Sequence, residues 1–228
     1  AQESRGLGDV YKRQMFGFDA KVINETTGEP CQANEKGMLV LAAPLPPGCL
    51  ATVWRNDERF INGYFSLLDG KQYATSDYAV MDEYGYYYIL GRTDDVINVA
   101  GHRLGTKEIE EAIGHHPEVA ESAVVGIHDE LKGELPIAFC ILKNHDLVAE
   151  TENRFRIEQQ IVGEVARQLG ALAKPAAIYF PKALPKTRSG KILRRSIKAL
   201  AEGKETGDMS TLDDPTAIDA VRQAMADY

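Results

Sequence analysis

The sequence has few of the residues that mark secreted, membrane-spanning or nucleic-acid-binding proteins. Its 228 residues include only three cysteines, an odd number at wide spacing, which excludes a complete disulfide framework and a paired-cysteine metal site. The longest uncharged run, residues 38–54, is interrupted by three prolines and a glycine and so lacks the ~20 apolar residues of a membrane-spanning helix. Lysine and arginine number 26 against 34 aspartates and glutamates, which argues against a general nucleic-acid binder. We expect a folded cytoplasmic protein with no membrane or nucleic-acid partner.

The first 14 residues differ from the rest of the chain. Residues 9–14, Asp-Val-Tyr-Lys-Arg-Gln, are similar to a translated transposon adapter from shotgun sequencing. We therefore set residues 1–14 aside as a spurious segment and regard Met15 as a doubtful start. On this interpretation the chain is the C-terminal piece of a longer protein.

Residues 15–93 have the pattern of a β-rich unit. Short β-branched or aromatic runs at 20–24, 37–41 and 86–90 are separated by turn residues such as Pro46-Pro47-Gly48. This pattern predicts the end of a small β-barrel or sandwich.

From Asp94 onward helical and strand patterns are mixed, which predicts an α+β domain over residues 94–200. A compact hairpin is expected around Ala100-Gly101, and Thr106 is expected to cap the helix that follows. Further strands are predicted at 119–127, 136–142 and 176–180, helices at 152–169 and 191–200, and a loop at 185–190. Residues 201–228 are predicted to form an acidic, loosely packed tail with one short helix at 215–226.

One segment opposes the acidic character of the chain. Residues 174–200 contain eight basic residues and no acidic one, so we expect an anion to approach this segment. For Arg194, Arg195 and Lys198 the alternative is a solvated helix face. Lys191 ends the loop Pro-Lys-Thr-Arg-Ser-Gly-Lys and is expected at a helix start, where a phosphate would be bound well. The loop is no Walker phosphate loop, because Pro185 and Ile192 stand where that motif needs Gly and Ser or Thr.

Three motifs in order carry a family resemblance. They are Tyr-Ala-Thr-Ser-Asp at 73–77, Gly-Arg-Thr-Asp-Asp-Val-Ile-Asn-Val-Ala-Gly-His-Arg-Leu-Gly at 91–105, and Pro-Lys-Thr-Arg-Ser-Gly-Lys at 185–191. In this order and spacing they resemble the last motifs of the AMP-forming acyl-CoA synthetases, most of all the propionate-CoA ligases, with acetate-CoA ligases next. The resemblance implies the remnant of a small β-barrel subdomain followed by a mobile C-terminal lid domain.

The same resemblance implies a reaction and its cofactors. Enzymes of this family join a carboxylate to ATP, release pyrophosphate, and transfer the acyl group from acyl-AMP to coenzyme A, with Mg²⁺ expected for the full-length enzyme. Asp77 resembles the carboxylate that binds both ribose hydroxyls, Arg92 a further ribose contact, and Arg103 an arginine near the phosphates. The alternatives are a surface-turn aspartate for Asp77 and a surface ion pair for Arg92.

Four further roles follow from the resemblance. Asp94 matches the hinge of the lid, Gly101 the glycine that lines the pantetheine tunnel, and Lys191 the lysine that enters the site during adenylation. The alternatives are a plain turn glycine for Gly101 and a solvated lysine for Lys191. Arg167 and Lys174 are weak candidates for the CoA nucleotide. Lysine acetyltransferases and deacylases are possible partners acting on Lys191.

The sequence therefore predicts the C-terminal part of a propionate-CoA ligase that is inactive by itself. Acetate or another short-chain acid is the alternative substrate, because the residues of an acyl pocket are not identified in this sequence. A stand-alone regulatory or binding module is the alternative of a different class.

Overall fold

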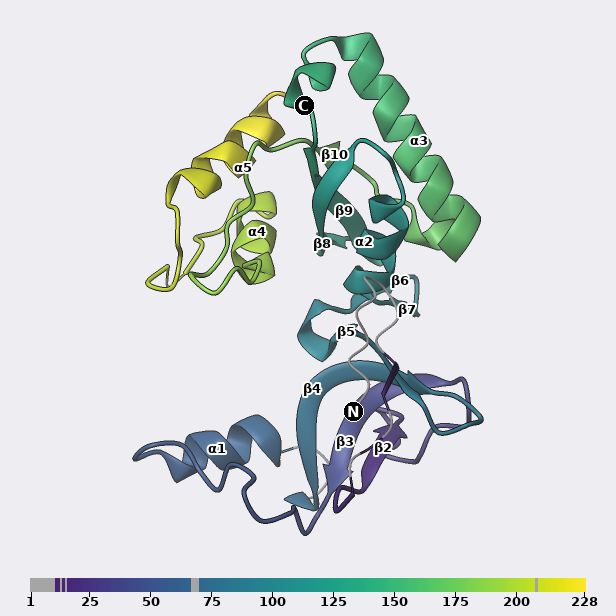
Figure 1. Ribbon diagram of the computed structural model, residues 1–228, viewed down its shortest axis with the longest axis vertical. Helices are drawn as coiled ribbons and strands as arrows, with labels where there is room; N and C mark the ends of the chain where they lie inside the picture. Colours follow the sequence, from purple (N-terminus) through teal and green to yellow (C-terminus); the bar gives the residue numbers. More distant parts are fainter. Residues whose placement is uncertain (1–10, 13, 15, 67–69, 208) are drawn as a thin grey trace. The chain divides into compact units, whose positions relative to one another are not determined.

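The computed structural model describes residues 11–12, 14, 16–66, 70–207 and 209–228. It divides into two compact units, residues 1–94 and 95–228 (Figure 1). The segment 1–14, which we set aside, lies mostly outside the described residues; within it, Tyr11–Lys12 forms strand β1. Among the described helices none has the length and apolar character that a bilayer span requires.

The first unit is built on an antiparallel sheet. Its strands are β1 (Tyr11–Lys12), β2 (Ala20–Ile23), β3 (Lys36–Ala42), β4 (Gln72–Met81) and β5 (Tyr87–Arg92), in the order β1-β5-β4-β3-β2, with helix α1 at Asp57–Tyr64. Alternation along the strands gives two small apolar clusters, one with Ile23, Met38 and Val40 and the other with Val22, Ala79 and Tyr87. Over the described residues this sheet is open, and it does not close into a barrel.

Besides β1, two elements of this unit lie where no element was predicted. Strand β4 has a mixed burial pattern and contains Ser76 at a φ of 61°, so its period-2 signal is weak. Helix α1 begins after Asn56, whose side chain accepts a hydrogen bond from the backbone N–H of Arg59, and two acidic residues occupy its first turn. This N-cap signal was readable in the sequence.

The second unit is a mixed sheet with helices on both faces. Its strands are β6 (Ile97–Val99), β7 (His102–Leu104), β8 (Val119–Asp129), β9 (Gly133–Leu142) and β10 (Ile178–Tyr179). Strand β9 pairs antiparallel with β8 and β6 and parallel with β10. The helices are α2 (Thr106–Gly114), α3 (Thr151–Leu169), α4 (Arg194–Ala201) and α5 (Thr216–Ala226), with short 3₁₀ turns at Thr93–Asp95, His145–Val148 and Ala171–Ala173.

Each face of the second sheet has its own apolar core. Helices α2 and α3 pack on one face through Ile109, Ile113, Ile157 and Ile161, and α4 and α5 pack on the other through Ile197, Leu200, Ile218 and Val221 (Figure 1). Successive residues of β8 and β9 therefore enter opposite cores, which explains the continuous apolar runs in both strands. The predicted α+β class is confirmed.

Three local predictions for this unit need correction. Thr106 is the first residue of α2 and Gly105 is its N-cap, with the Glu108 carboxylate accepting the Gly105 N–H at 3.2 Å. Helix α4 begins at Arg194, not at Lys191. The tail is not loosely packed, because Ile218 and Val221 of α5 are buried in the core beside α4. The hairpin around Ala100-Gly101 and the short helix near residues 215–226 are confirmed.

Candidate functional site

In the first unit, strands β4 and β5 bring Asp77 and Arg92 together. The two residues are register partners, and a guanidinium nitrogen of Arg92 lies 3.7 Å from the Asp77 carboxylate. Arg92 also contacts the Asp94 carboxylate at 3.3 Å and donates to the Thr75 carbonyl at 3.3 Å. Asp77 and Arg92 are 34% and 44% exposed, so both remain open to a ligand.

A break in strand regularity sets the direction of these side chains. The pairing of β4 shifts register against both β3 and β5 close to Asp77, and Ser76 has a positive φ. The Thr75 hydroxyl holds this bulge, since it donates to the Leu39 carbonyl at 2.8 Å and accepts the Asp77 N–H at 3.1 Å. The motif at 73–77 therefore forms a bulged strand, and Asp77 does not lie in a surface turn.

A cavity of about 480 Å³ borders Arg92. It is lined by Val53, Trp54, Asn56, Arg59, Gly63, Tyr64, Ser76 and Arg92. Trp54 is 85% exposed, and its ring lies 5.2 Å from the Arg55 guanidinium. Trp54 and Arg59 were not singled out from the sequence; the N-cap of α1 and the single tryptophan of the chain are the signals that point to them.

In the second unit, the hairpin β6–β7 carries Gly101 and Arg103. Ala100 and Gly101 have φ values of 50° and 84°, the geometry of a two-residue hairpin turn with both central residues left-handed. A Cβ added to Gly101 would meet nothing within 4 Å, so the surface of the turn is open. Arg103 is exposed on β7 opposite Asn98.

The loop before α4 presents Lys191. The Thr187 N–H donates to the Lys191 carbonyl at 2.8 Å, the Thr187 hydroxyl accepts the Lys191 N–H at 3.1 Å, and Gly190 has a φ of 82°. These bonds close a tight turn over residues 187–191. The Lys191 side chain is exposed and makes no ion pair with any residue that the structure describes.

Neighbouring basic residues are neutralised by acidic partners. Lys186 binds Glu121 at 2.7 Å, Lys198 binds Glu134 at 2.8 Å, and Arg194 holds both carboxylate oxygens of Glu110 at 2.9 and 2.7 Å. Burial alone would lower the pKa of Arg194, and the Glu110 carboxylate reverses this so that the pKa is raised. The alternative of a solvated helix face is therefore wrong for Arg194, whose side chain is 22% exposed, whereas the Lys198 side chain is 38% exposed and Arg195 is exposed.

The two weak CoA candidates lie at the end of α3. Arg167 is 69% exposed and binds Glu164 at 3.1 Å, an interaction that lowers the pKa of Glu164 to about 2, with Gln168 adding a second hydrogen bond. Lys174 is exposed after the 3₁₀ turn Ala171–Ala173. Neither lines the cavity beside Arg92.

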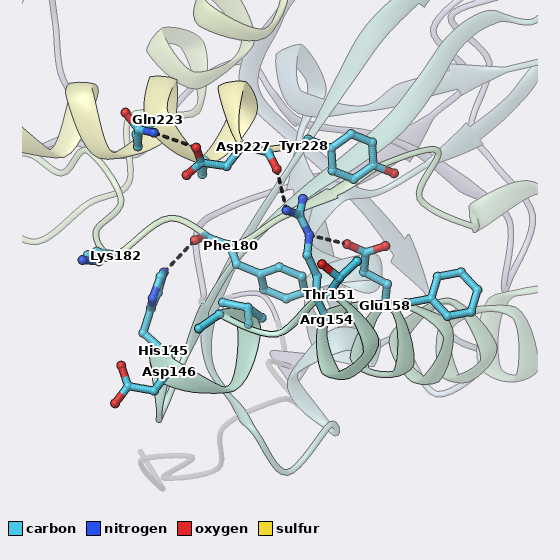
Figure 2. Close-up of a pocket in the computed structure, with 14 residues that line it drawn as sticks. His145, Asp146, Thr151, Arg154, Glu158, Phe180, Lys182, Gln223, Asp227 and Tyr228 are labelled. Atoms are coloured by element: carbon cyan, nitrogen blue, oxygen red, sulfur yellow. Dashed lines mark hydrogen bonds and ion pairs between the residues drawn. The ribbon is translucent and has the colours of Figure 1, made fainter.

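A larger cavity of about 760 Å³ lies between α3, β10 and α5 and contains none of the predicted site residues (Figure 2). Arg154 binds Glu158 at 3.0 Å, donates to the Asp227 carbonyl at 2.8 Å and lies over the Tyr228 ring. His145 contacts the Phe180 carbonyl at 3.0 Å. Arg154 therefore connects α3 to the end of α5, and His145 connects the 3₁₀ turn His145–Val148 to the residue after β10.

The described residues include groups of the kinds that bind a nucleotide. An exposed carboxylate beside an exposed guanidinium and a cavity suits a ribose, and an unpaired lysine suits a phosphate. No cluster of three or more His, Cys, Asp or Glu side chains with metal-binding geometry occurs in the described part of the chain.

Comparison with known proteins matches residues 108–191 to the AMP-binding enzyme C-terminal domain. The chain is 53% identical over 92% of its length to a propionate-CoA ligase of Salmonella typhimurium and 51% identical over 97% to one of Escherichia coli, covering 34% and 36% of those proteins. An acetyl-coenzyme A synthetase of Pyrobaculum aerophilum is 47% identical over 91% of this chain and 30% of its own. The chain thus spans about a third of the length of these curated relatives.

Solved structures of the same group share the fold. A crystal structure of an anthranilate CoA ligase in complex with anthranoyl-AMP has a TM-score of 0.69 at 30% identity, covering 83% of this chain and 34% of the other. Acetoacetyl-CoA synthetase from Streptomyces lividans has a TM-score of 0.79 at 22% identity, covering 95% and 32%, and supports the fold alone. Residues 108–191 therefore carry an AMP-binding enzyme C-terminal domain, and the chain is similar over most of its length to CoA ligases that contain this domain.

Proposed function

We propose that these residues form the C-terminal part of an AMP-forming propionate-CoA ligase. In the first half-reaction a propionate oxygen attacks the α-phosphorus of ATP and displaces pyrophosphate. In the second, the thiol of coenzyme A attacks the carbonyl carbon of propionyl-AMP, loses its proton and displaces AMP. Two relatives above 50% identity that carry the name propionate-CoA ligase support this choice. The 47% identical acetyl-coenzyme A synthetase makes acetate the second candidate substrate.

The ribose of the nucleotide is assigned to the first unit, and its phosphates to residues of the second unit. Asp77 accepts the ribose hydroxyls, Arg92 adds a donor to the same sugar, and Arg103 approaches the phosphates. An ionised carboxylate has two oxygens for two hydroxyl donors, which fits the ribose diol. Mg²⁺ would neutralise the phosphates when ATP is bound, and we assign it no ligand in this chain.

Lys191 is the residue we assign to the adenylation step. Its ammonium group would stabilise the negative charge that develops around the α-phosphate. The observation that carries this assignment is the tight turn over residues 187–191, which holds the backbone of Lys191 through Thr187 while the Lys191 side chain is exposed and without an ion pair in the described part of the chain. We include in the proposal the modification of Lys191 by a lysine acetyltransferase and its reversal by a deacylase, since acylation removes the charge.

Rotation of the second unit about Asp94 would move Lys191 out of the active site and bring the hairpin β6–β7 into its place. Asp94 lies in the short 3₁₀ turn at the division between the two units. In the second state the open face of Gly101 would border the pantetheine arm of coenzyme A. A cytoplasmic location is part of the proposal and agrees with the three free cysteines.

The test uses the complete protein, obtained by reading the gene upstream of Met15. Lys191→Ala should slow propionate-dependent pyrophosphate exchange by about 10²- to 10³-fold and leave the reaction of supplied propionyl-AMP with coenzyme A near its original rate. Lys182→Ala, a change at an exposed lysine of the same segment outside the loop, is the matched control. Equal loss in both half-reactions would refute the role of Lys191, and a higher kcat/KM for acetate than for propionate would favour the second substrate.

A further inference from the structure

The segment 209–213 is bound to the loop that presents Lys191. It lies between α4 and α5, in the yellow-green part of the tail (Figure 1). The Arg188 N–H donates to the Thr211 carbonyl at 3.3 Å, the Asp213 N–H donates to the Lys186 carbonyl at 2.9 Å, and Thr187 and Leu212 form an antiparallel bridge. We call residues 209–213 the strap.

The strap is itself anchored in the core of the second unit. Met209 and Leu212 pack against the cluster that holds Ile197 of α4 and Val221 of α5. The Leu212 N–H donates to the Met209 carbonyl at 3.0 Å, and the Ser196 hydroxyl contacts the Met209 sulfur at 3.6 Å. The strap is therefore a fixed support and not a free end.

Thr187 links the strap to Lys191. Its backbone bridges Leu212, its N–H and hydroxyl bind the carbonyl and N–H of Lys191, and its carbonyl accepts the Gly190 N–H at 2.8 Å. The hydroxyl also lies 3.0 Å from that of Ser189. No other side chain in the described residues binds the backbone of Lys191.

We propose that Thr187 is a positioning residue for Lys191 and that the strap holds Thr187 in place. The inference rests on the proposed role of Lys191 in adenylation. A long lysine side chain has high rotational freedom, so its ammonium group reaches a given point only if its backbone is held. The acidic tail thus contributes to adenylation through the backbone of the loop, although its side chains touch no substrate.

The first experiment measures amide hydrogen exchange in the 228-residue chain. Thr187→Val keeps the shape of the side chain and removes the hydroxyl, so exchange at Gly190 and Lys191 should become about tenfold faster, as expected for one lost hydrogen bond. Thr187→Ser keeps the acceptor and should remain within about twofold of the original chain. Thr27→Val is the matched control, because the Thr27 hydroxyl accepts the Glu29 N–H in an exposed turn of the other unit.

A second variant tests the strap without touching the loop. Asp213→Pro removes the N–H that binds the Lys186 carbonyl and favours the extended backbone at Leu212 that the bridge requires. Exchange at Arg188 and Lys191 should increase, whereas Asp213→Asn should change neither. Unchanged exchange in the loop of both Thr187→Val and Asp213→Pro would overturn the proposal. Faster exchange throughout the second unit with a lowered melting temperature would also overturn it, because Thr187 would then be a general structural residue.

Activity of the complete protein separates this inference from the proposed function. Thr187→Val should slow pyrophosphate exchange by about tenfold with the KM for ATP unchanged, should spare thioester formation from supplied propionyl-AMP, and should be rescued by Thr187→Ser. If Lys191→Ala impairs adenylation and Thr187→Val does not, the inference fails and the proposed function stands. If Lys191→Ala leaves adenylation unchanged, the proposed function fails, and the exchange experiment still decides whether Thr187 holds the loop.

Discussion

At the scale of single residues, basic side chains that are neighbours in the sequence differ in whether they form an ion pair. Arg194 is held by two hydrogen bonds to Glu110, whereas Arg195, the next residue of α4, is exposed. Asp77 and Arg92 form a long contact of 3.7 Å in which both groups are more than a third exposed, a kind of pair that contributes little to stability. Both groups can therefore exchange this contact for a ligand at low cost.

Asp77 is expected to affect ATP binding. Asp77→Ala in the complete protein should raise the KM for ATP by about tenfold or more, because hydrogen bonds to a charged group contribute ~1.5–3 kcal/mol. Initial rates of pyrophosphate exchange at varied ATP would measure this change. Asp19→Ala, which removes a surface contact to Lys21, is the control. An unchanged KM for ATP would remove Asp77 from the nucleotide site.

Cys49 should react with thiol reagents more readily than Cys140 does. Burial, with a smaller effect of the Glu110 carboxylate, raises the pKa of Cys140, and burial also raises that of Cys31. A raised pKa lowers the thiolate fraction at a given pH, and the thiolate is the reactive form. At pH 8 we expect Cys49 to be alkylated in the folded chain and Cys140 only after unfolding, as measured by peptide mass spectrometry. Alkylation of Cys140 in the folded chain would contradict its burial.

At the scale of elements, the pair Glu110–Arg194 joins α2 to α4 across the edge of the sheet. Their side chains are 12% and 22% exposed, and Glu110 also accepts the backbone N–H of Val124 at 2.9 Å. The pair thus connects three elements of the second unit. Helix α4 also carries Arg195, whose side chain is exposed and can serve as the comparison for Arg194.

Removal of Arg194 should destabilise the second unit. Arg194→Ala leaves the poorly exposed Glu110 carboxylate without its partner, which should lower the free energy of unfolding by about 2–3 kcal/mol. Urea unfolding followed by circular dichroism measures this difference. Arg195→Ala should change stability by less than about 0.5 kcal/mol, and similar losses in both variants would contradict the structural role of the ion pair.

The hairpin β6–β7 allows a test that separates bulk from backbone strain at Gly101. Both Gly101→Ala and Gly101→Leu force a side chain into a φ of 84°, a cost of about 1 kcal/mol, while only leucine adds bulk over the open turn. Gly101→Leu should retain pyrophosphate exchange and accumulate acyl-AMP, yet lose the CoA-dependent product far more than Gly101→Ala does. Equal losses in both half-reactions and in both variants, with lowered melting temperatures, would make Gly101 a structural glycine.

At the scale of the whole molecule, two units with separate cores carry different parts of one proposed reaction. The candidate ribose ligands lie in residues 1–94, and Lys191, Gly101 and Arg103 lie in residues 95–228. The chain spans about a third of its curated relatives. A pocket for the acyl group is not identified among the described residues.

The 228-residue chain is therefore expected to be inactive by itself. Propionate-dependent exchange of pyrophosphate into ATP should remain at background with the purified chain and appear with the complete protein under the same conditions. Radiolabelled pyrophosphate provides the measurement. Exchange by the isolated chain that depends on propionate would refute the interpretation that it is a part of a larger enzyme.

Much of the second unit was predictable because its signals are local. Apolar periodicity predicted α3, β8 and β9, and the turn Ala100-Gly101 predicted the hairpin, since each depends on neighbouring residues alone. Strand β4 was missed because its bulge interrupts the alternation. The start of α4 was placed too early because Lys191 belongs to the turn closed by Thr187 and Ile192 forms a bridge with Lys186.

The sequence by itself determined the three ordered motifs, on which the resemblance to the AMP-forming acyl-CoA synthetases and the proposed site residues depend. Only the tertiary structure decided what those residues contact. Ion pairs between residues 64 to 84 positions apart, such as Lys198–Glu134 and Arg194–Glu110, neutralise some basic groups and leave Lys191 exposed. The packing of the acidic tail also depends on tertiary contacts. Helix α5 is buried against α4, and the strap pairs with the loop that presents Lys191. Such contacts depend on which distant surfaces the fold brings together, and the local pattern of a chain does not contain that information.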